Sequence, residues 1–89
     1  MTVAKHVTYR GRVQGVGFRF TAVDVAQRHT VDGTVRNSFD GTVELFIQGE
    51  SDAVQAFLTD LECRMGHCIA EQTVQEATPT GVKGFHIVR

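Results

Sequence analysis

Hydrophobic and polar residues alternate along the first part of the chain, residues 3–13, where a polar residue separates Val7 from Tyr9. A period of two is typical of a strand with one buried face. From Phe18 to about His29 the apolar residues recur instead at intervals of three and four, with charged and amide side chains between them. This second pattern predicts an amphipathic helix that lies on a sheet.

Two further strand-like segments follow, at residues 31–37 and 42–49. The segment between them, Ser38–Gly41, contains the pair Asp40-Gly41, which is a strong short-range signal for a hairpin turn. We therefore expect these two strands to pair with each other in antiparallel orientation.

A second helix is predicted after residue 50. Ser51 and Asp52 stand where side-chain N-caps are expected, and Gly66 is a suitable C-terminal stop. The apolar residues of this segment have helical spacing and share one face: Val54, Phe57, Leu58 and Leu61.

Two more strand-like segments, residues 69–77 and 85–88, are separated by a turn at Thr78–Gly81. The order of elements is then β-α-β-β-α-β with an additional last strand. This order predicts an α+β fold of the ferredoxin-like type, a split βαβ sandwich. Its sheet would be five-stranded and mostly antiparallel, with both helices on one face, and residues 1–89 would form one domain.

The composition excludes some classes of function. The 89 residues include 42% hydrophobic residues and one proline, as in a small globular domain. The apolar runs are too short for a membrane span, and the first residues lack the apolar stretch of a secretory signal. We therefore expect a cytoplasmic protein without a membrane partner.

The net charge of −1 is unevenly distributed. Residues 1–36 carry six Lys or Arg against two Asp, a balance of +4, whereas residues 37–89 have a balance of −5. The positive part could attract a small anion, although a solvated strand surface explains Arg10 and Arg12 at least as well. A nearly neutral chain lacks the strongly basic surface typical of nucleic-acid binding. The arginines of the positive part that are candidates for an anion are Arg10, Arg12, Arg19 and Arg36.

The segment Gly11–Arg19 places three glycines within seven residues, directly before the first predicted helix. Glycines allow backbone N–H groups to turn inward around a small ligand, and helix N-termini attract anions. Arg19 in the first turn opposes the helix dipole by roughly 0.3–1 kcal/mol, so it fits best beside a bound anion. A phosphate is the simplest such anion.

With these residues in place, the chain resembles the acylphosphatase family. The segment GRVQGVGFR, Gly11–Arg19, matches the first signature of that family throughout. Residues 33–43, with Gly49 six residues further on, closely match the second signature, and Phe85–Arg89 is similar to the closing strand. The resemblance therefore extends over the whole predicted domain.

The resemblance implies hydrolysis of the carboxyl-phosphate bond of small acyl phosphates, without a metal or other cofactor, by direct attack of water. In this sequence Arg19 would clamp the phosphoryl group and Asn37 would position the water. A monomer is expected. The alternative is a non-catalytic anion-binding or regulatory module, because the ferredoxin-like fold serves many functions. The residues that would bind phosphate, mainly through loop amides, are Gln14, Gly15, Val16, Gly17, Phe18 and Arg19.

The residues agree with this chemistry independently of the resemblance. The two motifs supply no Cys, His, Lys or carboxylate nucleophile beside the loop, and no cluster of metal ligands. Because a carboxylate is a good leaving group, positioning of water and stabilisation of phosphoryl charge would be sufficient for catalysis. The phosphate of the substrate would accept the proton of the attacking water.

Some features have alternative interpretations. The Gln14 side chain would act either as a loop brace or as a ligand contact, and Asn37 taken alone would suit a turn former. Cys63, His67 and Cys68 lie close together in the sequence. A soft-metal site, a disulfide and two free cysteines are all compatible with this spacing, and the cytoplasmic expectation favours free cysteines.

Other positions are expected to be structural or to depart from the family. His6, His29 and His86 are scattered without evident partners and are expected to be structural. Thr34 stands where the family usually has a large residue, and His29-Thr30 stands where a Leu-Gly pair is common. Loss of a left-handed glycine at the helix end would cost about 1 kcal/mol of stability rather than activity.

Overall fold

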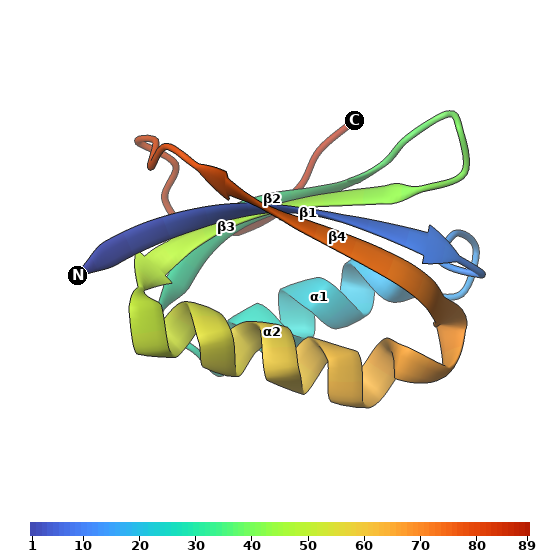
Figure 1. Ribbon diagram of the computed structural model, residues 1–89, viewed down its shortest axis with the longest axis horizontal. Helices are drawn as coiled ribbons and strands as arrows, with labels where there is room; N and C mark the ends of the chain where they lie inside the picture. Colours follow the sequence, from blue (N-terminus) through green and yellow to red (C-terminus); the bar gives the residue numbers. More distant parts are fainter.

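The sheet and the helices form two layers (Figure 1). In the computed structural model, which describes all residues from Met1 to Arg89, both helices cover the same face of one five-stranded sheet. Along the chain the elements are β1 (Thr2–Gly11), α1 (Phe18–Ala26), β2 (Val31–Asn37), β3 (Val43–Glu50), α2 (Ser51–Met65), the short 3₁₀ helix η1 (Gly66–Cys68), β4 (Ile69–Ala77) and β5 (Phe85–Ile87).

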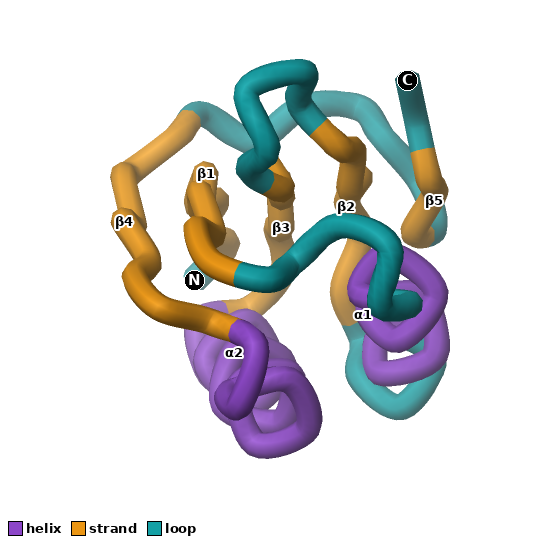
Figure 2. Tube along the Cα trace, turned by 90° about the vertical axis from the view of Figure 1, so that its right-hand side faces the viewer, coloured by secondary structure: helices purple, strands orange, loops and turns teal.

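The strands lie in the order β4-β1-β3-β2-β5 across the sheet. Every neighbouring pair is antiparallel except β2 and β5, which run parallel. The view in Figure 2 shows β4 and β5 at the two edges, with α1 beside β2 and β5. The predicted split βαβ arrangement, with a mostly antiparallel sheet and both helices on one face, is confirmed.

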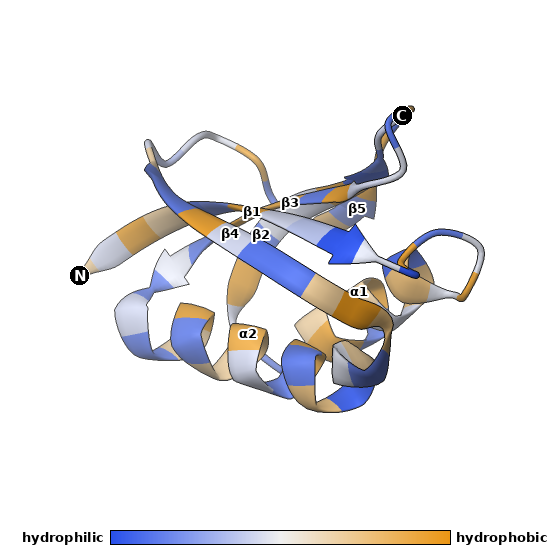
Figure 3. Cartoon of the chain, turned by 45° about the vertical axis from the view of Figure 1, so that its right-hand side comes forward, coloured by the Kyte–Doolittle hydropathy of each residue, from blue (hydrophilic) through white to orange (hydrophobic).

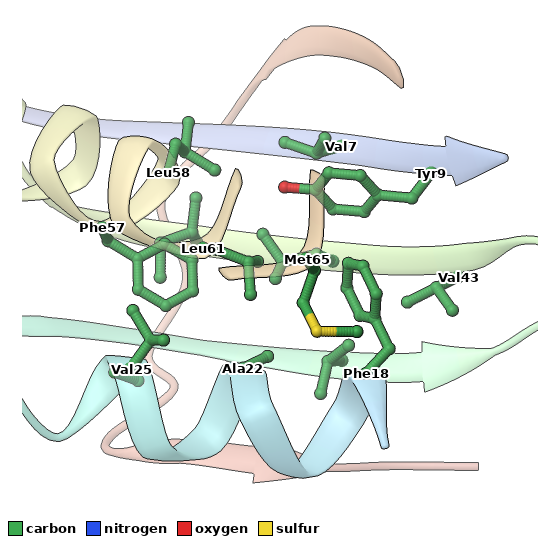
Figure 4. Close-up of a cluster of buried hydrophobic side chains, with 14 of the residues drawn as sticks. Val7, Tyr9, Phe18, Ala22, Val25, Val43, Phe57, Leu58, Leu61 and Met65 are labelled. Atoms are coloured by element: carbon green, nitrogen blue, oxygen red, sulfur yellow. The ribbon is translucent and has the colours of Figure 1, made fainter. Parts of the chain in front are cut away.

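The hydrophobic core lies between the two layers, because alternate residues of the central strands point toward the helices. The side chains of Val7, Tyr9 and Leu45 have no exposed surface. The rings of Tyr9 and Phe18 pack with their centroids 5.0 Å apart, and Figure 4 shows the helix residues that meet them. Figure 3 shows apolar and polar residues alternating around α2, as the spacing predicted. Each such buried side chain contributes about 1.5–3 kcal/mol.

The first helix is shorter than predicted, since it ends at Ala26 rather than near His29. The amides of Arg28 and His29 donate hydrogen bonds to the carbonyls of Val25 and Ala26, three residues back. Such bonds tighten the chain out of the α-helical pattern. No residue other than glycine has a positive φ. Thr30 therefore has an ordinary backbone conformation, and the predicted cost of a missing glycine does not arise.

The second helix begins where predicted, but the predicted side-chain cap is wrong. Glu50 is the N-cap residue, in an extended conformation, and no side chain bonds to the first turn. Ser51 and Asp52 already lie within the helix. The carboxylate of Asp52 in the first turn still interacts favourably with the helix dipole.

The structure distinguishes between the three alternatives for Cys63 and Cys68, which lie on either side of the end of α2. The helix stops at Met65, and Gly66 has a φ of −56° rather than a left-handed conformation. Cys63 and Cys68 are both free, and no group of three or more His, Cys, Asp or Glu side chains could hold a metal ion. The structure thus contains neither the disulfide nor the soft-metal site. None of the helices has the length and hydrophobicity needed to cross a membrane.

The three scattered histidines have partners, contrary to the sequence-based expectation. His29 Nε2 lies 3.1 Å from a carboxylate oxygen of Asp60, which joins the end of α1 to α2. His6 Nε2 lies 3.4 Å from a carboxylate oxygen of Glu44. The Nε2 atom of His86 lies 2.5 Å from the backbone carbonyl of Lys83. The first two contacts connect different elements of the fold, and the third is local to the segment that leads into β5.

Candidate active site

The glycine-rich loop between β1 and α1 requires backbone conformations that glycine adopts most readily. Gly15 has a φ of 77° and Gly17 a φ of 80°. Gly17 is the N-cap of α1, and neither a side-chain cap nor an acidic residue occupies the first turn. Because no carboxylate competes for the helix N-terminus, its positive end is open to an anion.

The Gln14 side chain braces this loop against the β2–β3 hairpin. Its Nε2 atom donates hydrogen bonds to the carbonyl oxygens of Ser38, at 2.6 Å, and Thr42, at 2.9 Å. Of the two interpretations of this side chain, the structure thus shows the brace. The loop is tied directly to the residue that follows Asn37.

Asp40 stabilises the turn of the β2–β3 hairpin through Thr42. Its Oδ1 atom accepts hydrogen bonds from the Thr42 hydroxyl, at 2.7 Å, and from the Thr42 amide, at 3.1 Å. These two bonds hold the pKa of the Asp40 carboxyl below its ordinary value. The carbonyl of Thr42 is the acceptor for Gln14, so Asp40, Thr42 and Gln14 form one connected set.

Arg19 lies in the first turn of α1, next to the fully buried Phe18. Its side chain is half-buried and forms no ion pair with any carboxylate of the chain. Arg36, another candidate from the sequence, pairs instead with Glu44 at 2.8 Å. Arg10 lies 3.8 Å from a carboxylate oxygen of Glu71. Arg12 is exposed and also forms no ion pair, so Arg12 and Arg19 are the two guanidinium groups of the glycine loop that are available for an anion.

Asn37 is the last residue of β2, two positions after the buried Val35. Because side chains alternate along a strand, Asn37 shares the face of Val35 toward the helices, whereas Arg36 points to the other face. The Oδ1 atom of Asn37 is buried and has no hydrogen-bond partner. The structure thus lacks the local backbone bond that a turn-forming Asn would accept.

A hollow of about 240 Å³ brings these residues together at the N-terminus of α1. Gln14 and Val16, which the sequence also assigned to phosphate binding, complete the loop but do not line this hollow. Val13 and Phe20 line it although the sequence did not indicate them. The lining residues are Val13, Gly15, Gly17, Phe18, Arg19, Phe20 and Asn37.

A second hollow, of about 460 Å³, also contains Arg19 and Asn37 in its lining. Its other lining residues are Ile87, Val88 and Arg89, which belong to β5 and the segment after it. The sequence placed these residues in a closing strand but not at a site. Only the parallel pairing of β5 with β2 could have indicated them, since it brings the end of β5 beside the end of β2.

Comparisons with known proteins agree with this arrangement. The family model described as Acylphosphatase matches residues 5–87. The acylphosphatase of Azorhizobium caulinodans is 42% identical over 98% of this chain and 96% of its own length. The acylphosphatase of Bifidobacterium longum is 56% identical over 66% of this chain and 61% of its own length.

A solved structure supports the same relationship. The crystal structure of acylphosphatase from Bacillus subtilis superimposes with a TM-score of 0.87, at 29% identity, over 100% of both chains. The fold is therefore the ferredoxin-like α+β fold of that enzyme, and the hydrolysis of acyl phosphates is the activity that the comparisons support. This chain belongs to the acylphosphatase family.

Proposed function

We propose that this acylphosphatase binds the phosphoryl group of its substrate in the hollow at the N-terminus of α1. One observation carries the proposal: Arg19 without an ion partner and Asn37 with an unpartnered oxygen line the same hollow as Gly15 and Gly17. The backbone amides of Gln14–Phe18 would surround the phosphoryl oxygens. A buried acceptor without a partner costs about 1–3 kcal/mol, which a bound water would offset.

Arg19 supplies the positive charge of the proposed site. A guanidinium presents a planar fork of donors that matches two phosphoryl oxygens, and the helix N-terminus adds a partial positive charge. Both groups are fixed before the substrate arrives, so they stabilise the negative charge of the transition state without reorganisation. With this charge supplied by the chain itself, we propose that the reaction proceeds without a metal ion or another cofactor.

Asn37 orients the attacking water. Its Oδ1 atom accepts a hydrogen bond from one O–H group of the water. This orientation leaves a lone pair of the water oxygen directed at phosphorus. A bond forms between the water oxygen and phosphorus while the bond between phosphorus and the acyl oxygen breaks. The carboxylate leaves with the bonding electron pair, and a phosphoryl oxygen takes the proton of the water.

The domain organisation, oligomeric state and compartment of the protein are also part of the proposal. Residues 1–89 form one acylphosphatase-like domain that acts as a monomer on a small acyl phosphate in the cytoplasm. Two free cysteines are consistent with a reducing compartment. The nearly neutral net charge of −1 favours neither a nucleic-acid partner nor a membrane surface.

The test is the release of phosphate from acetyl phosphate and from p-nitrophenyl phosphate, with and without a chelator. We expect hydrolysis of acetyl phosphate at the same rate in both conditions, and little hydrolysis of the monoester. Loss of activity with the chelator would contradict metal independence. Binding of inorganic phosphate without turnover of acetyl phosphate would favour the non-catalytic module instead.

A further inference from the structure

The chain contains a single asparagine, Asn37, which is the residue proposed to position the attacking water. Asparagine is thermolabile, because the backbone nitrogen of the next residue can attack its side-chain carbonyl carbon. The next residue is Ser38, whose small side chain leaves more room around that nitrogen than a branched one would. Asparagine deamidation in this chain is therefore confined to Asn37, in the candidate active site.

The end of the β2–β3 hairpin restrains the nitrogen that would attack. The Ser38 amide donates a 2.8 Å hydrogen bond to the Thr42 carbonyl, and Asn37 lies opposite Val43 in the ladder. The Ser38 nitrogen must leave Thr42 before it can approach the Asn37 side chain. The rate of deamidation thus depends on the fraction of time for which this end of the hairpin is open.

The side chain of Gln14 stabilises the closed hairpin end. Its Nε2 atom donates hydrogen bonds to the carbonyls of Ser38, at 2.6 Å, and Thr42, at 2.9 Å. The Thr42 carbonyl therefore accepts bonds from both the Ser38 amide and Gln14. The Oδ1 atom of Asn37 has no hydrogen-bond partner, so no donor holds this oxygen against rotation toward Ser38. Closure of the hairpin end, rather than a restraint on Asn37 itself, limits the reaction.

We infer that Asn37 is a deamidation site that inactivates this enzyme, and that the hydrogen bonds of Gln14 keep the reaction slow. The Ser38 nitrogen gives up its proton to the solvent and forms a bond with the Cγ atom of Asn37. The bond between Cγ and Nδ2 breaks, and Nδ2 takes up a proton and leaves as ammonia. Water then opens the resulting succinimide ring at either carbonyl, which leaves aspartate or isoaspartate at position 37.

The loss of activity rests on the proposed function, because it follows from the role of Asn37 in the hollow. A carboxylate at position 37 would share the lining of the first hollow with Arg19. It would pair with the guanidinium and compete with the phosphoryl group of the substrate. Isoaspartate would also lengthen the main chain at the end of β2.

The experiment stores the folded full chain in mildly alkaline solution. Mass spectrometry of the peptide that contains residue 37 measures deamidation, and hydrolysis of acetyl phosphate is measured relative to its starting value. We expect activity to fall in step with deamidation. Gln14→Ala should deamidate about fivefold faster, the effect of losing one hydrogen bond. Ser38→Thr should deamidate more slowly than the wild type, because a β-branched side chain crowds the attacking nitrogen.

Gln48→Ala is the matched control, because the Gln48 side chain donates to the Thr80 carbonyl rather than to the hairpin turn. It should deamidate at the wild-type rate. Equal rates in the wild type and Gln14→Ala, or an equal increase in Gln48→Ala, would overturn the inference. If deamidation at the expected rates left the hydrolysis of acetyl phosphate intact, Asn37 would have no part in catalysis. The proposed function, rather than the protection by Gln14, would then be wrong.

Discussion

The side-chain amide of Gln14 donates a 2.6 Å hydrogen bond to the backbone carbonyl of Ser38. Gln14 belongs to the loop before α1, and Ser38 follows Asn37 at the end of β2. This one contact joins the glycine loop to the strand end that carries the proposed water-positioning residue. The two halves of the site are therefore held in register by a side chain that lines neither hollow.

Replacing Gln14 with alanine should lower kcat/KM for acetyl phosphate about tenfold, because small displacements of catalytic groups are costly. The loss of two hydrogen bonds should also lower the free energy of unfolding by about 1–2 kcal/mol. Steady-state kinetics and urea unfolding measure the two effects separately.

The matched control is Gln48→Ala. Gln48 lies in β3, and its side-chain amide likewise donates a hydrogen bond to a backbone carbonyl, that of Thr80 at 2.8 Å, but it lines neither hollow. It should destabilise the fold by a similar amount and leave kcat/KM nearly unchanged. Equal loss of activity in both variants would show that Gln14 acts only through general stability.

Arg19→Lys should lower kcat/KM for acetyl phosphate about 100-fold or more, since an ammonium group cannot reproduce the fork of a guanidinium. The fold should remain intact, as judged by circular dichroism. Arg28→Lys, an equivalent change beyond the end of α1, is the control and should have little effect. A folded Arg19→Lys protein with near-wild-type turnover would remove Arg19 from the clamp role.

Asn37→Ala should lower kcat about 100-fold while inorganic phosphate still binds and inhibits, because a water-positioning residue acts on the chemical step. Thr34→Ala changes a residue of the same strand that lines neither hollow, and it serves as the control. Isothermal titration calorimetry with phosphate distinguishes the water-positioning role of Asn37 from the phosphate-binding role of Arg19. If Asn37→Ala lost phosphate binding as completely as Arg19→Ala, the proposed division of roles would be wrong.

The hydrogen bonds from Thr42 lower the pKa of Asp40 from its ordinary value of 3.8. A lowered folded-state pKa means that the stabilising contribution is present above the unfolded pKa and is lost as the pH falls through the folded pKa. A carbon-13 NMR titration should therefore find Asp40 titrating below 3.8. Thr42→Val should bring the pKa back toward the ordinary value, whereas Thr42→Ser should keep it low.

The hydroxyl of Tyr9 is buried without a hydrogen-bond partner. Because an unpartnered buried hydroxyl is unfavourable, Tyr9→Phe should raise the free energy of unfolding by about 1 kcal/mol. Tyr9→Leu, which removes the ring packed on Phe18, should lower it instead. Urea unfolding of the three proteins decides this, and a less stable Tyr9→Phe protein would indicate a hydrogen bond to the hydroxyl.

Tyr9→Phe should also change how the free energy of unfolding depends on pH in alkaline solution. Burial, and then the nearby Glu62 carboxylate, raise the pKa of Tyr9 above its ordinary value of 10.0. The stabilisation that results from this raised pKa is fully present below pH 10.0, and it is lost as the pH rises through the folded-state pKa. Tyr9→Phe should lose less stability than the wild type between pH 9 and about pH 11.

Most elements could be predicted from the sequence, because the alternation of apolar residues in a strand or helix is a local property. Residues 31–37 and 69–77 are strands with the predicted bounds, and the pair Asp40-Gly41 indeed turns the hairpin. Side-chain caps are less predictable. The start of α2 depends on Glu50, whose backbone conformation is imposed by the pairing of β3 rather than by a local preference.

The sequence by itself also determined the candidate chemistry, because the glycines, Arg19 and Asn37 belong to two short motifs. Only the tertiary structure decided which groups are free to act. Arg36 is engaged by Glu44 across the β2–β3 ladder, and the side chain of Gln14 is engaged by carbonyls more than twenty residues away. Arg89 lines the same hollow as Asn37, because β5 pairs in parallel with β2. These relationships depend on strand register and burial, which arise from contacts between distant segments and leave no periodic signal in any one of them.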